Sequence, residues 1–534
     1  MNENLEELFS VKEAATWASN YANKEVSPSN ISYLVQYAKI KKYNDASNNV
    51  QINITELQKY YDTLSEKEKK WKEKLGDDLN WGISFDQFKE SETTKHVHRL
   101  HPYKGKFIPQ LVEYFLDSHI NTFKKEVFFQ EGDIVLDPFM GSGTTLIQSA
   151  ELGLHSIGID ISGFNCLIAK VKSDDYSLFE LKYVLDGAYR KLVKFSNETF
   201  DNNFEMELKR RLSVFNGKYF PNPEFRHQVK KDRAFEVSYS EEKFQQFLKE
   251  NYEFLEHNGT RDPEHLFDEG KMSNFITKWY NKRIRQELYF YLKLIDAEEN
   301  EQTKNIMRII LSRTARSCRA TTHYDLATLK ERQIGPYYCF KHYKICTPID
   351  SILKHLKHYT EDTVQRLDEF ATLKKPVHVG IIHGDSRNLD IFEEIKNQNM
   401  AFYQMLSKKK ISGIFTSPPY VGQIDYHEQH AYAYELFNIP RRDDDEIGPM
   451  AKGTGKAAKE KYVQDISNVL KNVGKFVRDD GIFFVVANDK HNLYPKIAEK
   501  SGLKITQEYK RPVLNRTERD RQPYAEIIFQ MQKE

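Results

Sequence analysis

The sequence lacks a large net charge of either sign, a paired-cysteine motif and a long apolar segment. Its 534 residues include 79 basic and 78 acidic side chains, so any nucleic-acid surface requires local clusters of cations. The four cysteines form no Cys-x-x-Cys pair, which is typical of a reducing cytosol. No apolar run approaches the length of a membrane span. We therefore expect a cytoplasmic protein with no membrane partner and about three or four domains.

Residues 133–161 have the pattern of a strand, a glycine turn, a helix and a second strand. The apolar run 134–136 stops at an aspartate, and Gly141 and Gly143 then permit a turn where a side chain would clash. The second strand ends at Asp160. In a doubly wound sheet, an acid about 20 residues past the glycines holds ribose hydroxyls. The stretch therefore predicts a nucleoside-cofactor site at the carboxyl ends of parallel strands.

The glycine turn distinguishes between two kinds of cofactor. Leu146 stands where the dinucleotide fingerprint has its third glycine, which argues against diphosphate binding. DPFMGSGTT, at 137–145, instead resembles the S-adenosylmethionine loop of the DNA amino-methyltransferases. That family carries a second signature, (D/N/S)PP(Y/F), after a later strand, and ISGIFTSPPY at 411–420 matches it. The resemblance covers roughly residues 96–170 and 376–534.

The resemblance implies an α/β fold, with a Rossmann-like class I methyltransferase sheet that a large, mainly helical insertion interrupts. The insertion is too long for a loop and must be folded. We expect a helix-turn-helix-like DNA-binding domain and linker at 1–80, the first half of the methyltransferase domain at 81–175, a target-recognition insertion at 176–375, and the second half at 376–534.

The resemblance also implies S-adenosylmethionine as the cofactor. Asp160 would hold the ribose, and Asp385, directly after the expected strand 377–382, would accept from the adenine amino group. The basic turn HPYKGK, at 101–106, lies where the family has its most N-terminal cofactor motif, and would meet the methionine carboxylate. The predicted cofactor-binding residues are His101, Lys104, Lys106, Asp137, Pro138, Phe139, Gly141, Gly143, Thr144, Thr145, Asp160, Ile161, Asp385 and Ser386.

The tetrapeptide Ser417, Pro418, Pro419 and Tyr420 is the predicted catalytic segment. An exocyclic base amine is a poor nucleophile because its lone pair is delocalised into the ring. Acceptors at the Ser417 side chain and the Pro418 carbonyl would hold the amine hydrogens, and the prolines would preset the turn. Tyr420 would stack on a base flipped out of the duplex. None of the cysteines follows a proline, which argues against thiolate-dependent methylation of cytosine carbon 5.

A serine in the first position of the tetrapeptide resembles the cytosine-N4 enzymes. We therefore predict a site-specific methyltransferase of double-stranded DNA, in the bacterial or archaeal nucleoid, with a cognate restriction endonuclease as a partner. Adenine N6 is the alternative acceptor. Two other classes stay open, namely an RNA base N-methyltransferase such as the tRNA guanine-N2 enzymes, and a DNA-binding regulator with a degenerate methyltransferase fold.

The N-terminal segment resembles the small winged helix-turn-helix domains of the excisionase and MerR type. A first helix with Ala14 and Ala18 inward is followed by a Ser-Pro-Ser helix start, a short β segment and another helix. In this interpretation the helix 29–38 enters the major groove, with Lys41 and Lys42 near phosphates. The alternative is a helical element for dimerisation or packing.

Cations in the insertion are interleaved with aromatic residues, and this pattern predicts target recognition. The segment 311–333 supplies Arg313, Arg316 and Arg319, and such side chains suit phosphate contacts. Many of the aromatic residues must instead form the core of the insertion, and nearby acids offset some of the cations.

Two of the cysteines lie close to a histidine. Cys339 and Cys346 flank His342, which is one feature of a metal site. The sequence shows no further ligand pair at zinc spacing beside them. The pattern alone therefore predicts no metal site in this chain.

Overall fold

A seven-stranded sheet is the centre of the computed structural model, which describes residues 7–534 apart from 24–25, 37–38, 46, 76–78, 86–87, 89–91, 104, 106, 122–123, 259–273, 326–328 and 514–523. The strand order is β11-β12-β10-β9-β4-β5-β8. Its strands are β4 (Ile134–Asp137), β5 (His155–Asp160), β8 (Val379–His383), β9 (Ile411–Thr416), β10 (Val477–Ala487), β11 (Leu503–Val513) and β12 (Tyr524–Lys533).

The direction in which the chain builds this sheet reverses between β4 and β9. Strands β8, β5, β4, β9 and β10 are parallel, whereas β12 pairs antiparallel with β10 and β11. In doubly wound sheets, ligands bind outside the carboxyl ends of the strands at such a reversal. The predicted Rossmann-like methyltransferase sheet is confirmed.

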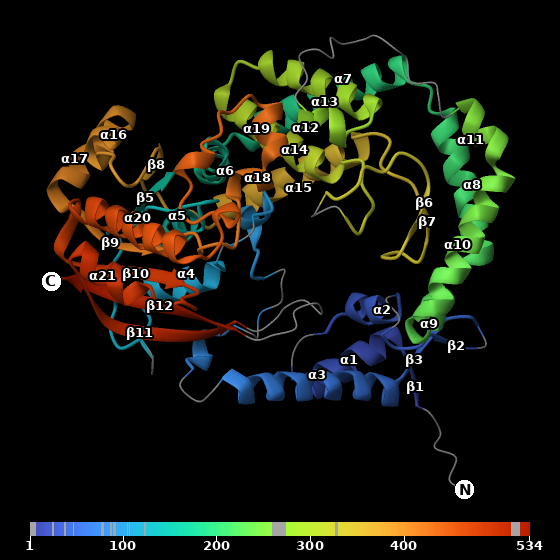
Figure 1. Cartoon of the computed structure of the whole chain (residues 1–534), viewed down its shortest axis with the longest axis horizontal. Helices are drawn as coiled ribbons and strands as arrows, with labels where there is room; N and C mark the ends of the chain where they lie inside the picture. The colour runs from blue at the N-terminus through green and yellow to red at the C-terminus, as the bar shows by residue number, and fades with distance from the viewer. Residues whose placement is uncertain are drawn as a thin grey trace, which may run out of the picture.

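Both faces of the sheet are covered, which explains why β4 is apolar throughout. Ile134 and Leu136 share a buried cluster with helices of one face, and Val135 belongs to a cluster on the other face with α4 (Pro109–Leu116). The helices of the first face are α16 (Ile391–Gln398), α17 (Met400–Lys409), α20 (Lys456–Gly474) and α21 (Tyr494–Ser501). Figure 1 shows them beside the strands.

Between β5 and β8 the chain leaves the sheet and forms mainly helices, as predicted. These are α6 (Gly163–Ser173), α7 (Leu178–Thr199), α8 (Asn203–Tyr219), α9 (Glu224–Lys231), α10 (Arg233–Glu250), α11 (Tyr252–Asn258), α12 (Asn274–Trp279), α13 (Lys282–Asp296), α14 (Glu301–Ser317) and α15 (Leu353–Ala371), with the hairpin β6 (Tyr337–Cys339) and β7 (Lys344–Cys346). No helix in the described part of the chain is both long and apolar enough to cross a membrane.

The insertion has two apolar cores. Helices α7, α13, α14 and α15 share one with α5 (Thr144–Leu152) and α6, through residues such as Leu185 and Ile310. Helices α8, α9 and α10 form the second core together with the hairpin. It contains Phe215 of α8, Phe247 of α10 and Ile345 of β7. In Figure 1 this second group extends as an arm from the helical body toward the N-terminal elements.

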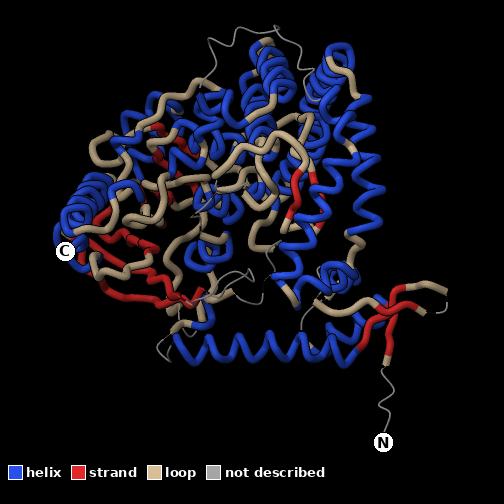
Figure 2. Tube along the Cα trace, turned by 45° about the vertical axis from the view of Figure 1, so that its right-hand side comes forward, coloured by secondary structure: helices blue, strands red, loops and turns tan. Residues whose placement is uncertain are grey.

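The N-terminal elements follow the order β1 (Leu8–Ser10), α1 (Val11–Tyr21), α2 (Pro28–Gln36), β2 (Tyr43–Asn44), β3 (Val50–Asn53) and α3 (Ile54–Leu75). The strands form an antiparallel sheet in the order β1-β3-β2. Ala14 and Ala18 are buried, as their spacing predicted, and Ile31 of α2 is buried with them. The long helix α3 runs from these elements toward the main sheet in both views (Figures 1 and 2).

The C-terminal strand pair consists of β11 (Leu503–Val513) and β12. β11 is the edge strand of the sheet, so its exposed positions carry polar side chains such as Lys504 and Glu508. An edge position also tolerates Pro512. These residues conceal the strand pattern in the sequence.

Candidate active site

The turn after β4 requires its two glycines. Gly141 and Gly143 adopt φ angles of +48° and +78°, in the left-handed region that favours glycine. A Cβ atom on Gly141 would lie 3.0 Å from the Tyr103 ring, and one on Gly143 would lie 3.0 Å from Ala169 of α6. The backbone can therefore approach its neighbours closely, and α5 begins directly after the turn.

Asp137 and Thr145, which we predicted as cofactor ligands, lie behind this turn. The Asp137 carboxylate accepts from the Thr145 hydroxyl at 2.7 Å and from the Thr416 hydroxyl at 2.6 Å. Burial raises the pKa of Asp137 to about 6, although these hydrogen bonds oppose the shift. Neither residue lines the cavity described below, and neither does Gly143. The hydrogen bonds of Asp137 instead join β4 to β9 and to the start of α5.

Asp160 projects from the carboxyl end of β5. Its carboxylate accepts from the backbone N–H of Gly141 at 2.9 Å and of Ser162 at 2.8 Å, and from the side-chain amide of Asn165 at 3.2 Å. Burial raises the pKa of Asp160 to about 6, and the same hydrogen bonds oppose that shift. Because a carboxylate has about four acceptor positions, the group can also accept from the hydroxyl of a ligand.

Asp385 and Ser386 follow β8 and connect it to its neighbours. The Arg387 guanidinium donates to the Asp385 carboxylate at distances from 2.7 to 3.0 Å. Burial alone would raise the pKa of Asp385, but the contacts with Arg387 outweigh it and lower the pKa. The Ser386 hydroxyl donates to the Pro138 carbonyl at 2.7 Å. The loop after β8 is thereby attached to the turn after β4.

The tetrapeptide 417–420 follows β9, the strand beside β4. The Tyr462 hydroxyl donates to the Pro419 carbonyl at 2.9 Å, and the Tyr420 hydroxyl donates to Glu526 of β12 at 3.2 Å. Within the described residues, the Ser417 hydroxyl has no hydrogen-bond partner. The turn is therefore held from two sides, while its first side chain stays available.

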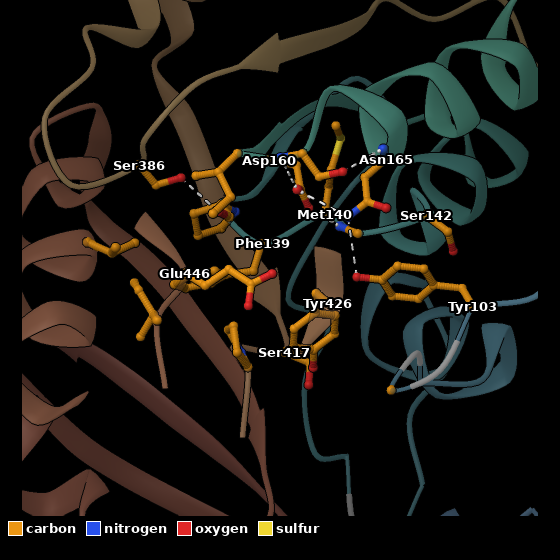
Figure 3. A pocket seen from close by; sticks show the side chains of 18 of the residues that line it. Tyr103, Phe139, Met140, Ser142, Asp160, Asn165, Ser386, Ser417, Tyr426 and Glu446 are labelled. Carbon is orange, nitrogen blue, oxygen red and sulfur yellow. Dashed lines mark hydrogen bonds between the residues drawn. The ribbon is translucent and has the colours of Figure 1, made fainter. Parts of the chain in front are cut away.

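These strand ends surround one cavity with about 880 Å³ of empty space, part of which is open to solvent. Figure 3 shows Asp160, Ser386 and Ser417 around the same space. The predicted residues that line the cavity are Pro138, Phe139, Gly141, Thr144, Asp160, Ile161, Asp385, Ser386, Ser417 and Pro419.

Several residues of the cavity wall were not predicted from the sequence. These are Tyr103, Gly105, Phe107, Met140, Ser142, Ser162, Asn165, Tyr426, His427, Asp445, Glu446, Ile447 and Val469. His427 and Glu446 are buried and bonded to each other, and the Glu446 carboxylate accepts from the His427 backbone N–H at 2.7 Å. The loop that carries Glu446 is polar and contains glycines, so its sequence does not indicate that it forms part of the cavity wall.

The wall of the cavity contains buried polar atoms without partners. Ser142 Oγ, Thr144 Oγ1 and Asn165 Oδ1 have no hydrogen-bond partner among the described residues. Leaving such groups unpaired is costly, so a polar ligand would complete this surface. Together with the acceptor Asp160 and the aromatic wall residues Phe107 and Phe139, these groups fit a nucleoside that carries a polar tail.

The basic turn at 101–106 only partly lies at this cavity. His101 is fully buried and does not line it, because its Nδ1 is 3.0 Å from the Pro102 carbonyl and its Nε2 is 3.3 Å from the Tyr432 hydroxyl. Burial lowers the pKa of His101 well below its usual value. His101, which we predicted among the cofactor-binding residues, therefore lies behind the cavity wall. Lys104 and Lys106 lie outside the described residues.

The remaining tetrapeptide residues, Pro418 and Tyr420, are not part of the cavity wall. The aromatic rings that line it are those of Tyr103, Phe107 and Phe139, together with Tyr426 and His427. The structure thus positions the Tyr420 ring beside β12, through its hydroxyl, rather than over the cavity.

Two of the three arginines predicted for DNA binding point inward. Arg313 of α14 is 7% exposed, and its guanidinium donates to Asp362 at 2.5 Å and to Thr363 at 2.9 Å. Arg319 is 6% exposed, and its Nε donates to the backbone carbonyl of Arg316 at 2.9 Å. Arg313 packs against α15, and the Arg319 guanidinium lies 5.6 Å from the centroid of the Tyr432 ring, so neither side chain is on the surface and their role in DNA binding stays a prediction.

The other predicted cations are more accessible. Arg316 is partly exposed and makes no ion pair within the described residues. Lys41 and Lys42 are exposed, and the Lys41 ammonium lies 3.3 Å from the Glu56 carboxylate of α3. Of the five predicted DNA-binding residues, these three therefore keep a surface position.

Comparisons with known proteins agree with the methyltransferase fold. Residues 1–171 match the DNA methylase family. The chain is 51% identical over 528 residues to the Type II methyltransferase M.MjaII of Methanocaldococcus jannaschii, which covers 99% of this chain and 97% of that protein. Shorter matches include the Type II methyltransferases M.BsoBI of Geobacillus stearothermophilus, at 30% identity over 24% of this chain and 23% of the relative, and M.MvaI of Kocuria varians, at 31% over 21% and 23%.

The parallel sheet, the cavity at its point of reversal and the two signature turns define a class of enzyme that binds a nucleoside cofactor and acts on an amine. The near full-length match then makes the assignment specific: the chain belongs to the DNA amino-methyltransferases of the Type II class.

Proposed function

We propose that the enzyme transfers a methyl group from S-adenosylmethionine to the N4 amine of a cytosine that is flipped out of double-stranded DNA. The observation that carries this proposal is that Gly141 and Asp160 on one side, and Ser417 and Pro419 on the other, line a single cavity. A cofactor and an extruded base can therefore meet there. The adenine N6 amine is the alternative acceptor.

The cofactor side of the cavity has the groups that S-adenosylmethionine needs. Asp160 would accept from the ribose hydroxyls, as acids at this position do in doubly wound sheets. The unpaired oxygens of Ser142, Thr144 and Asn165 would take the remaining polar atoms of the ligand. Asp385 lines the same wall and would receive the adenine amino group. When bound, the cofactor supplies a methyl group that its sulfonium has already activated.

The base side of the cavity offers acceptors for an amine. The Ser417 hydroxyl and the Pro418 carbonyl would hold the two amine hydrogens and direct the nitrogen lone pair toward the methyl group. The anchoring of Pro419 by Tyr462 keeps this turn fixed. Tyr420 would stack on the base only after its ring turned from β12, so Tyr426 and Phe107, which already line the cavity, are the nearer candidates for that contact.

DNA recognition would involve the N-terminal elements and the insertion. The winged arrangement of α1, α2 and the strands β1 to β3 suits a helix-turn-helix, with α2 at the major groove and Lys42 near a phosphate. Arg316 is the insertion arginine that keeps an accessible position. The relatives are Type II methyltransferases, which favours a role beside a cognate restriction endonuclease on the nucleoid.

The decisive experiment is expression of the chain in cells that lack DNA methylation, followed by sequencing that distinguishes N4-methylcytosine from N6-methyladenine. We expect N4-methylcytosine within one short recognition sequence, and none with Ser417→Ala. In vitro, duplex DNA and tRNA are compared as substrates, with duplex DNA expected to accept the label. N6-methyladenine would select the alternative acceptor, and labelled tRNA with unlabelled DNA would overturn the proposal.

A further inference from the structure

Four potential metal ligands converge at the β6–β7 hairpin, far along the chain from the signature turns. They are His323, Cys339, His342 and Cys346, and one ligand atom of each lies within 4.8 Å of every other. The two cysteines are buried, at 2% and 8% exposure, and the two histidines lie at the edge of the group. The sequence showed the pair Cys339 and Cys346 near His342 but not the contribution of His323.

Two distances between these atoms match those of a tetrahedral metal site. His323 Nδ1 lies 3.7 Å from Cys339 Sγ, and His342 Nδ1 lies 3.7 Å from Cys346 Sγ. With zinc bonds of about 2.3 Å to sulfur and about 2.0 Å to nitrogen, ligand atoms at the corners of a tetrahedron stand about 3.3–3.8 Å apart. A central ion would therefore require only small side-chain movements.

The backbone explains how the ligands come together. The turn between β6 and β7 is closed by hydrogen bonds to the Cys339 carbonyl from the backbone N–H of His342 at 3.1 Å and of Tyr343 at 2.7 Å. It folds His342 back over the strand that carries Cys339. The Tyr337 hydroxyl lies 2.7 Å from His323 Nδ1 and accepts from the His323 backbone N–H at 2.9 Å. These contacts place His323 beside the hairpin. A metal that binds through His323 Nδ1 would displace the Tyr337 hydroxyl from that nitrogen.

We propose that His323, Cys339, His342 and Cys346 bind one zinc ion. Two thiolates and two imidazoles are the donor set that zinc prefers in closed structural sites, and two thiolate charges balance the ion. Four protein ligands leave no position for water, so the site is structural rather than catalytic. The binding free energy would stabilise a hairpin that has only a three-residue strand on each side.

The hairpin connects the zinc site to the arm and to the N-terminal elements. Asn216 of α8 exchanges two hydrogen bonds of 2.9 Å with the backbone of Ile345. The Arg226 guanidinium of α9 lies 4.7 Å from the Tyr343 ring centroid and donates to the Lys341 carbonyl at 3.2 Å and to the Gln36 carbonyl at the end of α2 at 2.5 Å. The ion would thus fix the segment on which both the arm and α2 rest.

The test measures zinc in the full-length protein, purified with zinc in the medium and then dialysed. We expect about one zinc per chain in the wild type and in the control Cys318→Ala. Cys318 is the buried C-cap of α14 and is not one of the four ligands. Cys339→Ser and Cys346→Ser should lose the metal. Replacing zinc with Co²⁺ in the wild type should give the visible absorption of tetrahedral cobalt and a thiolate charge-transfer band. This measurement uses only wild-type protein, so it does not depend on whether a variant folds.

Three results would overturn the proposal. The first is wild-type protein that holds neither zinc nor cobalt, and the second is zinc that remains bound in Cys339→Ser. The third is a disulfide between Cys339 and Cys346 in protein prepared without reductant, with no metal present. Any of them would mean that these four side chains do not hold a zinc ion.

A second readout rests on the proposed function. Chelation of the metal should lower the temperature of unfolding and weaken binding of duplex DNA several-fold, while S-adenosylmethionine binding stays unchanged, because the cofactor cavity shares no wall residue with the hairpin. Zinc bound at one per chain with no effect on DNA binding would leave the zinc site in place and count against the DNA role of the arm.

Discussion

The cofactor edge of the sheet and the insertion hold their polar side chains in different ways. At the edge, Asp160 and Ser417 project from the ends of strands whose backbones are fixed by neighbouring strands. In the insertion, polar side chains hold one another, as Arg313 and Asp362 do, or the four residues of the proposed zinc site. A substitution at the edge should therefore change chemistry and leave the fold intact, whereas one in the insertion should cost stability.

The largest effect should follow Ser417→Ala. The variant loses an acceptor that would align the base amine, and removal of one such group typically costs about 10²- to 10³-fold in kcat. Because Ser417 has no hydrogen-bond partner among the described residues, stability and cofactor affinity should stay at wild-type values. Turnover with a labelled methyl donor, calorimetric cofactor binding and thermal unfolding measure the three quantities.

Ser407→Ala, at an exposed position on α17, is the matched control and should behave as wild type. If Ser417→Ala weakened cofactor binding as much as it lowered turnover, Ser417 would act on the cofactor rather than on the base amine, and its proposed role would be wrong.

The next effect in size concerns stability. Arg313→Ala removes one partner of a buried ion pair and leaves Asp362 with Arg366 alone, so the free energy of unfolding should fall by about 3 kcal/mol. Arg316→Ala, one turn away and without an ion pair in the described part of the chain, should leave stability nearly unchanged and weaken DNA binding. Denaturant unfolding and DNA titrations of both variants check this contrast, and the reverse assignment of effects would contradict it.

The same contrast explains what the sequence could and could not predict. Gly141, Asp160, Asp385 and Ser417 lie at or shortly after the carboxyl ends of strands, and parallel strands end at one edge, so local motifs predicted this part of the cavity wall. Asp137 lies in the same motif, yet only the neighbouring strand with Thr416 shows that it faces inward.

In the insertion no strand order constrains the side chains. Arg313 and Arg316 occupy adjacent turns of one helix, and their different orientation depends on where α15 packs. His323 meets Cys339 only through the fold of the intervening loop, so its spacing in the sequence carried no signal. Composition showed that the segment is cationic but not which cations face solvent.

A smaller effect should appear in the pH dependence of cofactor binding. Burial raises the pKa of Asp160 to about 6, and ribose hydroxyls donate to the ionised carboxylate. Affinity should therefore be constant above about pH 6 and fall at lower pH, by at most about tenfold per pH unit. Asp385 should not contribute in this range, because Arg387 keeps its pKa below the usual value.

Calorimetric titrations between about pH 8 and about pH 5 measure this dependence. Asp160→Asn should bind weakly at every pH and lose the dependence, since its amide does not titrate. A wild-type affinity that stayed flat through pH 6, or a decline that persisted in Asp160→Asn, would show that another group controls binding at the edge.

The smallest effect should come from the exposed cations of the N-terminal elements, which belong to neither kind of site. Lys42→Ala should weaken duplex DNA binding only a few-fold and reduce the slope of log affinity against log salt by about 1, as the loss of one phosphate contact does. Lys41→Ala should have less effect because Glu56 already neutralises that ammonium. Lys496→Ala, on α21, is the remote control. An unchanged slope in Lys42→Ala, with a reduced slope in Lys41→Ala, would mean that Lys41 contacts the phosphate in place of Lys42 and that its ion pair with Glu56 opens on binding.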